Sequence, residues 1–221
     1  MILLKYSILN YISFYIFENL YTHYEVGSII LFKKDDFSNI IMSKVYTSAV
    51  VIIPPEEKWP AIQDIREKYD RQINRWMPHI TLMYPFRPEN EYYILKKSFS
   101  DKCKSIESFE IHLKEFNYFN HGKQRYTLWL NPKPNDLITN LQSKIQRIVP
   151  DCNDVIKYKN GFKPHLSVGQ IQGKNNLIEI MNHLQNNWNE IYFLVNEIFF
   201  ISREKSKTSK FAIKKRIKLQ E

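Results

Sequence analysis

Residues 78–82 read Pro-His-Ile-Thr-Leu, and residues 164–168 repeat the pattern as Pro-His-Leu-Ser-Val. In each copy a proline precedes the histidine, an apolar residue separates the histidine from a hydroxyl residue, and a second apolar residue follows. Side chains at positions i and i+2 of a β-strand point to the same face. Each segment is therefore predicted to present an imidazole beside a hydroxyl, while the apolar residue between them points into a core.

The sequence around these segments alternates between helical and extended patterns. Amphipathic helices are predicted over residues 57–70, 89–104, 134–149 and 174–188. Strands are predicted over residues 48–53, 79–84, 109–113, 126–130, 165–168, 192–201 and 211–219. The order helix, histidine strand, helix occurs twice, and the two histidines are 165 − 79 = 86 residues apart. Such a repeat indicates two similar lobes related by internal duplication.

Spacing along the predicted helices indicates which faces are buried. Ile62, Ile65 and Tyr69 form one face of the first helix. In the helix over residues 89–104, Tyr93, Ile94 and Lys97 are found at helical spacing. The faces predicted for the last two helices are Leu137, Leu141, Ile145 and Ile148, and Leu177, Ile178, Met181 and Leu184.

Composition limits the classes of function that this chain can have. None of its five glycines lies in a G-x-G-x-x-G or G-x-x-x-x-G-K-[ST] pattern, so a Rossmann or P-loop nucleotide site has no support. The formal net charge of +9 favours anionic partners such as RNA, nucleotides or phosphates, although biased lysine and asparagine usage gives the same value. Cys103 and Cys152 lack metal-ligand spacing. We expect them to be reduced and structural in a cytoplasmic protein.

The first 44 residues are predicted to form an extension of uncertain order, followed by a single domain over residues 45–221. Residues 2–20 are apolar and aromatic, but Asn10, Ser13 and Glu18 interrupt them, so they fall short of a good spanning helix. A targeting role for this extension stays open. We expect no membrane association and a monomeric protein.

The paired segments suit acid–base chemistry on a phosphate. Histidine has an ordinary pKa of about 6.5, so either protonation state exists near neutrality. One neutral imidazole would take a proton from the attacking water, and the other, protonated, would give one to the leaving ribose oxygen. The hydroxyls of Thr81 and Ser167 would donate to non-bridging oxygens. A single such motif more often marks a structural histidine, but two matching copies favour function. This chemistry needs neither a metal nor a cofactor.

Three stretches together resemble the 2H phosphoesterase superfamily, which includes the bacterial 2′-5′ RNA ligase-like proteins. They are Arg-Trp-Met-Pro-His-Ile-Thr-Leu-Met-Tyr-Pro-Phe at 75–86, Phe-Asn-Tyr-Phe-Asn-His at 116–121 and Phe-Lys-Pro-His-Leu-Ser-Val-Gly-Gln at 162–170. The resemblance runs from about Val45 to Leu219, and Ser167 replaces the usual threonine. It implies a bilobal α+β fold with two antiparallel sheets facing a central cleft, helices on the outside and a pseudo-two-fold duplication.

The resemblance also implies an activity. It implies a phosphodiesterase that hydrolyses 2′,3′-cyclic phosphates, or related cyclic or 2′-5′ phosphodiester bonds, of RNA ends or nucleotides. His79 and His165 match the acid–base pair, and Thr81 and Ser167 match the phosphate-binding hydroxyls. Three alternatives stay open: a 2′-5′ RNA ligase, a 2′-5′ oligoadenylate phosphodiesterase, and an RNA-end-binding module without turnover.

Five further residues are candidates for substrate binding. Tyr84 could reach substrate where its strand ends, or pack in a core. Phe162 could stack a base, and Lys163 could meet phosphate. His121 could line the cleft mouth, and Arg203 could contact substrate, or both could simply face solvent.

The C-terminal region is rich in lysine and could follow an RNA backbone. A solvated face is the alternative. The positively charged residues concerned are Lys205, Lys207, Lys210, Lys214, Lys215, Arg216 and Lys218.

Overall fold

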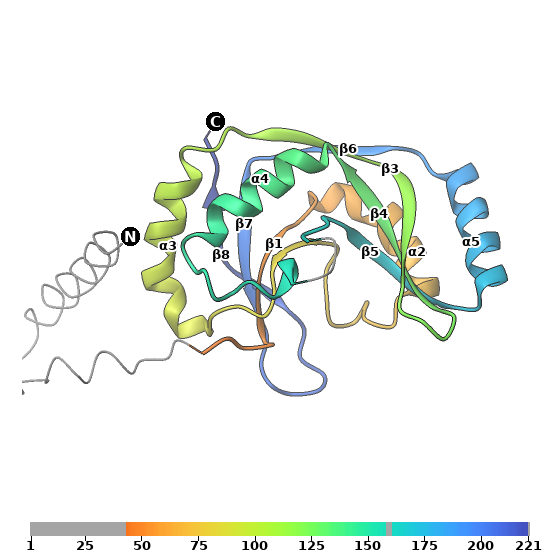
Figure 1. The fold of residues 1–221 in the computed structure, drawn as a ribbon, viewed down its shortest axis with the longest axis horizontal. Helices are drawn as coiled ribbons and strands as arrows, with labels where there is room; N and C mark the ends of the chain where they lie inside the picture. The colour runs from red at the N-terminus through yellow and green to blue at the C-terminus, as the bar shows by residue number, and fades with distance from the viewer. Residues whose placement is uncertain (1–42, 158–160, 221) are drawn as a thin grey trace, which may run out of the picture. The chain divides into compact units, whose positions relative to one another are not determined.

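The computed structural model describes residues 43–157 and 161–220 (Figure 1). The strands in this part are β1 (Ser48–Ile52), β2 (Ile80–Met83), β3 (Phe109–Asn120), β4 (Arg125–Lys133), β5 (Leu166–Gln172), β6 (Ile191–Val195), β7 (Glu197–Ser202) and β8 (Ala212–Lys218). The α-helices are α2 (Trp59–Tyr69), α3 (Tyr92–Cys103), α4 (Asn135–Gln146) and α5 (Lys174–Asn187). Short 3₁₀ turns precede α2 and α3 at Glu56–Lys58 and Glu89–Glu91. A third lies at Asp154–Ile156.

The predicted N-terminal extension lies outside the described residues, apart from residues 43 and 44. Its order and its role therefore stay predictions. Within residues 43–157 and 161–220, no helix is long and apolar enough to cross a membrane.

The eight strands form one curled antiparallel sheet in the order β6-β3-β4-β5-β2-β1-β7-β8. This confirms the predicted combination of helices with antiparallel strands. The resemblance implies two sheets, whereas hydrogen bonds here connect all eight strands. The connection between β2 and β5 is a single residue pair, Ile80 with Leu166. It joins two four-stranded halves, each with one histidine segment at its inner edge. The two-lobed arrangement and the duplication stay predictions.

The two faces of the sheet are buried by different groups of side chains. Strand β1 is buried on both sides because its residues alternate between two clusters. Val50 and Ile52 belong to the main core, to which all four helices contribute. The helix residues in it include Ile62, Phe99, Leu141 and Leu177. The opposite face carries a smaller second core of Ala49, Val51, Ile53, Phe199, Ile201 and Phe211.

The predicted faces of three helices needed correction. In α3, Tyr93 and Ile94 are 70% and 49% exposed, and the buried residues are instead Tyr92, Leu95, Phe99 and Cys103. Similarly, Leu137 of α4 and Ile178 of α5 are exposed. Their neighbours Ile138 and Leu177 are buried. Several apolar periodicities coexist in such short helices, and the direction from which the sheet approaches selects one of them.

The single strand predicted over residues 192–201 is wrong, because Asn196 divides it into β6 and β7. Strand β6 pairs with β3, whereas β7 pairs with β1 and β8. The C-terminal segment joins these regions: the Leu219 N–H donates to the Asn196 carbonyl at 2.7 Å, and the Gln220 N–H donates to the Ile106 carbonyl at 2.9 Å. These bonds attach the chain after β8, one edge strand, to the residues that follow β6, the other edge strand, and that precede β3.

Candidate functional site

The pair that joins β2 to β5 also determines where the two motifs meet. Ile80 and Leu166 are fully buried in the main core. Continuing their antiparallel register by one residue places His79 opposite Ser167 and Thr81 opposite His165. These four side chains therefore share the face turned away from the main core, as predicted, and all four are partly exposed. The structure brings the two motifs together on one face of the sheet.

The two imidazole rings are held by equivalent hydrogen bonds. Nδ1 of His79 lies 2.7 Å from the Met77 carbonyl oxygen, and Nδ1 of His165 lies 2.8 Å from the Lys163 carbonyl oxygen. A carbonyl oxygen only accepts, so each Nδ1 carries the hydrogen and donates. Nε2 is then the basic nitrogen of both rings, with its lone pair available for a proton.

His79 lies at the end of a stack of aromatic rings. The Trp76 ring stacks on it at 4.6 Å between centroids and 16° between planes. Trp76 also stacks on Phe211, at 3.7 Å between centroids, and the Tyr84 ring meets Trp76 edge-on at 5.3 Å. This stack connects the second core to the imidazole and limits its movement.

His165 has a different environment, with aromatic edges and a cation. The rings of Phe119 and Trp129 lie 4.9 and 5.9 Å from it in edge-to-face geometry. The Lys163 ammonium lies 4.8 Å from the Trp129 ring centroid. Phe119 is partly exposed, whereas Trp129 is fully buried. Phe119 thus adds an accessible aromatic surface beside the second imidazole.

Both imidazoles are poised to be neutral. Burial lowers the pKa of His79 to about 4, and positive charge on Arg66 and on His165 lowers it as well. Burial also lowers the pKa of His165, and the Lys163 ammonium acts in the same direction. The electrostatic coupling of the two histidines agrees with their neighbouring positions, immediately before β2 and β5.

A family model described as the 2′-5′ RNA ligase superfamily matches residues 54–207. The chain belongs to this superfamily. The matched range contains both histidine segments and most of the sheet. No sequence among the curated proteins matches the chain significantly.

Solved structures of similar fold include LigT of E. coli in complex with 3′-AMP, with 14% identity and a TM-score of 0.50. That match covers 81% of this chain and 100% of LigT. The protein TT0787 of Thermus thermophilus matches with 17% identity and a TM-score of 0.51, over 79% of this chain and 98% of that protein. At these identities the likeness concerns the fold.

This member of the superfamily has a buried polar connection between its two motifs that the sequence analysis missed. The Arg66 side chain, 2% exposed, donates to Asp70 through Nε at 2.8 Å and to the Trp76 carbonyl through Nη2 at 2.8 Å. Asp70 Oδ1 accepts from Nε2 of Gln170, a residue of β5, at 3.0 Å. The connection therefore fixes the loop before His79 to the strand after His165. An Arg-Asp pair four residues apart is typical of an exposed helix face, so its sequence pattern carries little signal.

A glycine allows α2 and β5 to pack closely at the same place. A Cβ atom on Gly169 would lie 2.6 Å from the Cβ atom of Tyr69. Only glycine fits this position without moving the helix. The packing keeps Asp70, at the end of α2, within reach of Gln170.

The five predicted substrate-binding residues have different environments. Lys163 is exposed beside His165, as described above. Tyr84 packs against the second core, and its hydroxyl donates to the Tyr46 carbonyl at 3.1 Å. Phe162 packs against the main core. Arg203 donates to the carbonyl oxygens of Glu204 and Ser206, within its own loop.

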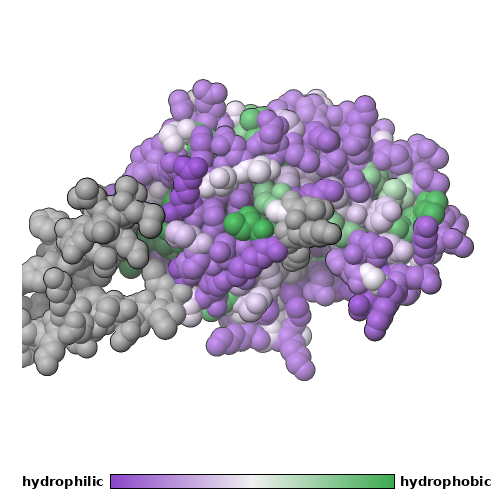
Figure 2. Space-filling model, in the orientation of Figure 1, coloured by the Kyte–Doolittle hydropathy of each residue, from purple (hydrophilic) through white to green (hydrophobic). Residues whose placement is uncertain are grey.

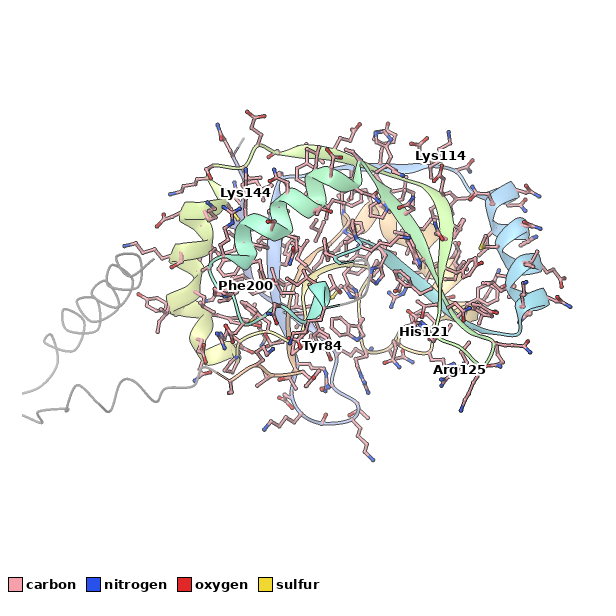
Figure 3. The ribbon with its side chains drawn as sticks, in the orientation of Figure 1. Tyr84, Lys114, His121, Arg125, Lys144 and Phe200 are labelled. Carbon is pink, nitrogen blue, oxygen red and sulfur yellow. The ribbon has the colours of Figure 1, made fainter. Side chains whose placement is uncertain are left out.

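His121 lies at the turn between β3 and β4, where its Nε2 is 2.9 Å from the Thr127 hydroxyl. Figure 3 shows His121 and Arg125 at this turn, while Tyr84 lies near the β7–β8 connection. Of the predicted candidates, Lys163 lies beside His165, and Tyr84 contacts Trp76, which stacks on His79. Their roles in binding stay predictions.

A cavity of about 240 Å³ lies elsewhere on the molecule. Residues from β1, β6, β7 and β8 line it, among them Ile52, Leu194 and Arg216, together with Trp59. None of the nine predicted site residues contributes to its wall. Among the described residues, no group of three or more His, Cys, Asp or Glu side chains is arranged to hold a metal ion.

Proposed function

We propose that this protein is a metal-independent phosphodiesterase that hydrolyses 2′,3′-cyclic phosphates, or related cyclic or 2′-5′ phosphodiester bonds, of RNA ends or nucleotides. Membership of the 2′-5′ RNA ligase superfamily supports a phosphodiesterase or ligase-type activity. The observation that carries the proposal is the equivalent orientation of two imidazoles on one face, each with Nε2 as the available nitrogen.

In the proposed reaction, the phosphate lies between the two rings. Nε2 of one histidine takes a proton from water as the water oxygen bonds to phosphorus. Nε2 of the other, protonated, gives its proton to the ribose oxygen as the bond from that oxygen to phosphorus breaks. The product is a phosphomonoester with a free ribose hydroxyl. Thr81 and Ser167 donate hydrogen bonds to the non-bridging oxygens, where negative charge develops.

The lowered pKa values of both histidines determine how each ring reaches the protonation state that its role as base or acid requires. The neutral ring needed as the base is the resting form at neutral pH. The acid must gain a proton, and the negative charge of a bound phosphate favours the protonated ring beside it. Substrate binding therefore prepares the acid, while burial keeps the base neutral.

The base of the substrate is expected to lie on Phe119. This ring is partly exposed and lies beside His165, whereas Phe162 packs against the main core. Aromatic side chains stack with any base. Solved complexes of E. coli LigT contain 3′-AMP, ATP and NADP⁺, which supports a nucleotide as the ligand of this fold.

The same proton transfers with a different nucleophile give a second candidate activity, 2′-5′ RNA ligation. The family description favours keeping it. A 2′,3′-cyclic phosphate end would be attacked by a ribose hydroxyl in place of water, and the acid and base would be the same two histidines.

The proposal is tested with 2′,3′-cyclic mononucleotides in the presence of EDTA. The wild-type protein is expected to hydrolyse them, and His79→Ala and His165→Ala are each expected to lose about 10²–10⁴-fold in rate. His183→Ala, an exposed histidine on α5, is the matched control. Circular dichroism checks the fold of each variant. If the two site variants hydrolyse as fast as the wild type, the proposal fails.

A further inference from the structure

The connection between β7 and β8 is attached to the His79 side of the site. We call residues 203–211 the basic loop. The Phe211 N–H donates to the Arg75 carbonyl at 2.9 Å, just before the first motif. The Phe211 ring stacks on Trp76, and Trp76 stacks on His79. Two ring contacts therefore link the loop to the imidazole, which fixes the position of the loop relative to the site.

Hydrogen bonds inside the basic loop give it a defined shape. Arg203 Nη1 donates to the Glu204 carbonyl at 2.9 Å and to the Ser206 carbonyl at 3.2 Å. The Ser209 hydroxyl lies 2.9 Å from the Ser206 carbonyl oxygen. Arg203 thus directs these donors into the loop itself. The loop lysines remain on the outside, and all are exposed: Lys205, Lys207 and Lys210.

The positive charge of the C-terminal region is not distributed evenly. On β8, Lys214 pairs with Glu89 at 3.2 Å and Arg216 pairs with Glu197 at 2.7 Å. No ion pair is described for the three loop lysines within residues 43–157 and 161–220. The basic loop carries four positive charges and one negative charge, Glu204, a net charge of +3.

Figure 1 shows the basic loop projecting beyond the ends of β7 and β8, and Figure 2 shows a hydrophilic surface at the same place. A surface with unpaired ammonium groups attracts a polyanion. Lysines at successive loop positions suit a flexible chain of phosphates, because an ammonium group contacts a phosphate without strict geometry.

We propose that the natural substrate is a single-stranded RNA whose phosphates continue from the site onto the basic loop. This inference rests on the proposed function, and it chooses an RNA end over a free nucleotide. A 2′,3′-cyclic phosphate ends an RNA at its 3′ terminus, so the loop holds the phosphates on the 5′ side of the scissile group. The lysines act on binding of the strand and take no part in proton transfer.

Salt dependence separates the two substrate classes. Each phosphate contact to single-stranded RNA adds about 0.7 to the slope of log affinity against log salt. Three lysine contacts therefore make oligonucleotide affinity fall about 20-fold more than nucleotide affinity between 50 and 200 mM salt. A free nucleotide, which ends at the site, lacks this extra dependence.

The experiment compares the wild type with Lys205→Gln/Lys207→Gln/Lys210→Gln. It measures kcat/KM for a 2′,3′-cyclic mononucleotide and for a ten-nucleotide RNA with the same end, at 50 and 200 mM salt. The wild-type preference for the RNA over the mononucleotide is expected to be about 20-fold larger at 50 mM than at 200 mM salt. The triple variant is expected to lose that preference and to keep its mononucleotide kcat/KM within about twofold.

A matched control replaces three exposed lysines outside the basic loop with glutamine: Lys96, Lys104 and Lys114. Equal losses in the control and loop variants would overturn the inference, and so would an undiminished RNA preference in the loop variant. So would loss of binding to anionic lipid vesicles with RNA binding unchanged, since the loop would then serve a membrane.

A binding measurement keeps the inference separate from the proposed activity. Fluorescence anisotropy follows a labelled ten-nucleotide RNA that ends in a 3′-phosphate and cannot react. If the wild type hydrolyses no cyclic phosphate, the proposed function fails. Weaker binding of this RNA by the loop variant alone would still support the basic loop as an RNA surface.

Discussion

At the scale of the residue, the site depends on how two imidazoles are oriented and what surrounds them. Backbone carbonyls hold both Nδ1 atoms, so the chemistry is assigned to Nε2. Trp76 stacks on one ring, while Phe119 and Lys163 lie beside the other. The two histidines therefore share a tautomer but differ in their neighbours. The difference gives each of them its own response to pH and to mutation.

The pH dependence of kcat/KM is expected to reach its maximum below pH 6.5. One imidazole must be neutral and the other protonated, and both have a lowered pKa, that of His79 being about 4. Lys163→Gln removes a positive charge beside His165, so the pKa of His165 rises. The limb of the profile that His165 controls is then expected to move to higher pH. Unchanged limbs in this variant, or limbs moved equally by Lys96→Gln, would contradict this account.

Phe119→Leu is expected to raise KM for a cyclic nucleotide. The variant keeps an apolar side chain but removes the ring on which we place the base, and base stacking contributes about 1–3 kcal/mol. A rise in KM of about fivefold or more follows, with a smaller effect on kcat. Steady-state kinetics measure it, and Phe162→Leu provides the comparison. A larger rise in KM for the Phe162 variant would place the base on that ring instead.

At the scale of the element, α2 and β5 hold the two motifs in place through buried polar contacts. Arg66 joins Asp70 to the Trp76 carbonyl, and Gln170 of β5 completes the connection. Both charged side chains of this ion pair are almost fully buried. Gly169 lets the helix approach the strand closely enough for these bonds to form. Losing any part of this connection is expected to affect stability and the site together.

Arg66→Ala is expected to lower the free energy of unfolding by about 3–5 kcal/mol, because it leaves the Asp70 carboxylate buried without its partner. Urea denaturation measures the change. Lys68→Ala, at an exposed position of the same helix, is expected to stay within about 0.5 kcal/mol of the wild type. Comparable losses in the two variants would show that the buried pair has no special role.

Most elements could be predicted from the sequence because their apolar periodicity is strong. The exceptions have physical causes. The main core contains residues 191, 193 and 195 and then 198 and 200, so the alternation shifts phase at Asn196. Apolar residues on both sides of Asn196 and Glu197 hide this shift, and pairing with different strands separates β6 from β7. The four motif residues were predictable because a two-residue spacing determines a shared face. The ion pair of Arg66 was not, since its burial depends on a strand a hundred residues away.

At the scale of the whole molecule, the C-terminal segment links the β8 edge of the sheet to residues next to β6 and β3. Leu219 is 3% exposed and contributes to the main core. The Gln220 carbonyl accepts from the Ser108 N–H at 2.9 Å, in addition to the two bonds that Leu219 and Gln220 donate. This short segment therefore connects the beginning of β3 to the junction between β6 and β7.

Removal of residues 219–221 is expected to cost about 5 kcal/mol of unfolding free energy. Three backbone hydrogen bonds contribute about 1 kcal/mol each, and burial of a leucine side chain contributes about 2 kcal/mol. Thermal and urea unfolding measure the loss. Gln220→Ala keeps the backbone donor and acceptor, so its stability is expected to remain close to that of the wild type. A large loss in Gln220→Ala would assign the effect to the side chain.

Strands β2 and β5 are joined by a single residue pair, Ile80 with Leu166, which is fewer than between any other two neighbouring strands of the sheet. The two histidines lie at this junction. A phosphate held by His79, Thr81, His165 and Ser167 would add cross-links between the halves. Phosphate binding at the site and the stability of the contact between the two halves are then thermodynamically coupled. A ligand at 100 times its Kd stabilises the folded protein by about 2.7 kcal/mol. Ligand binding at this junction is therefore expected to hold the two halves of the sheet together and to stabilise the fold.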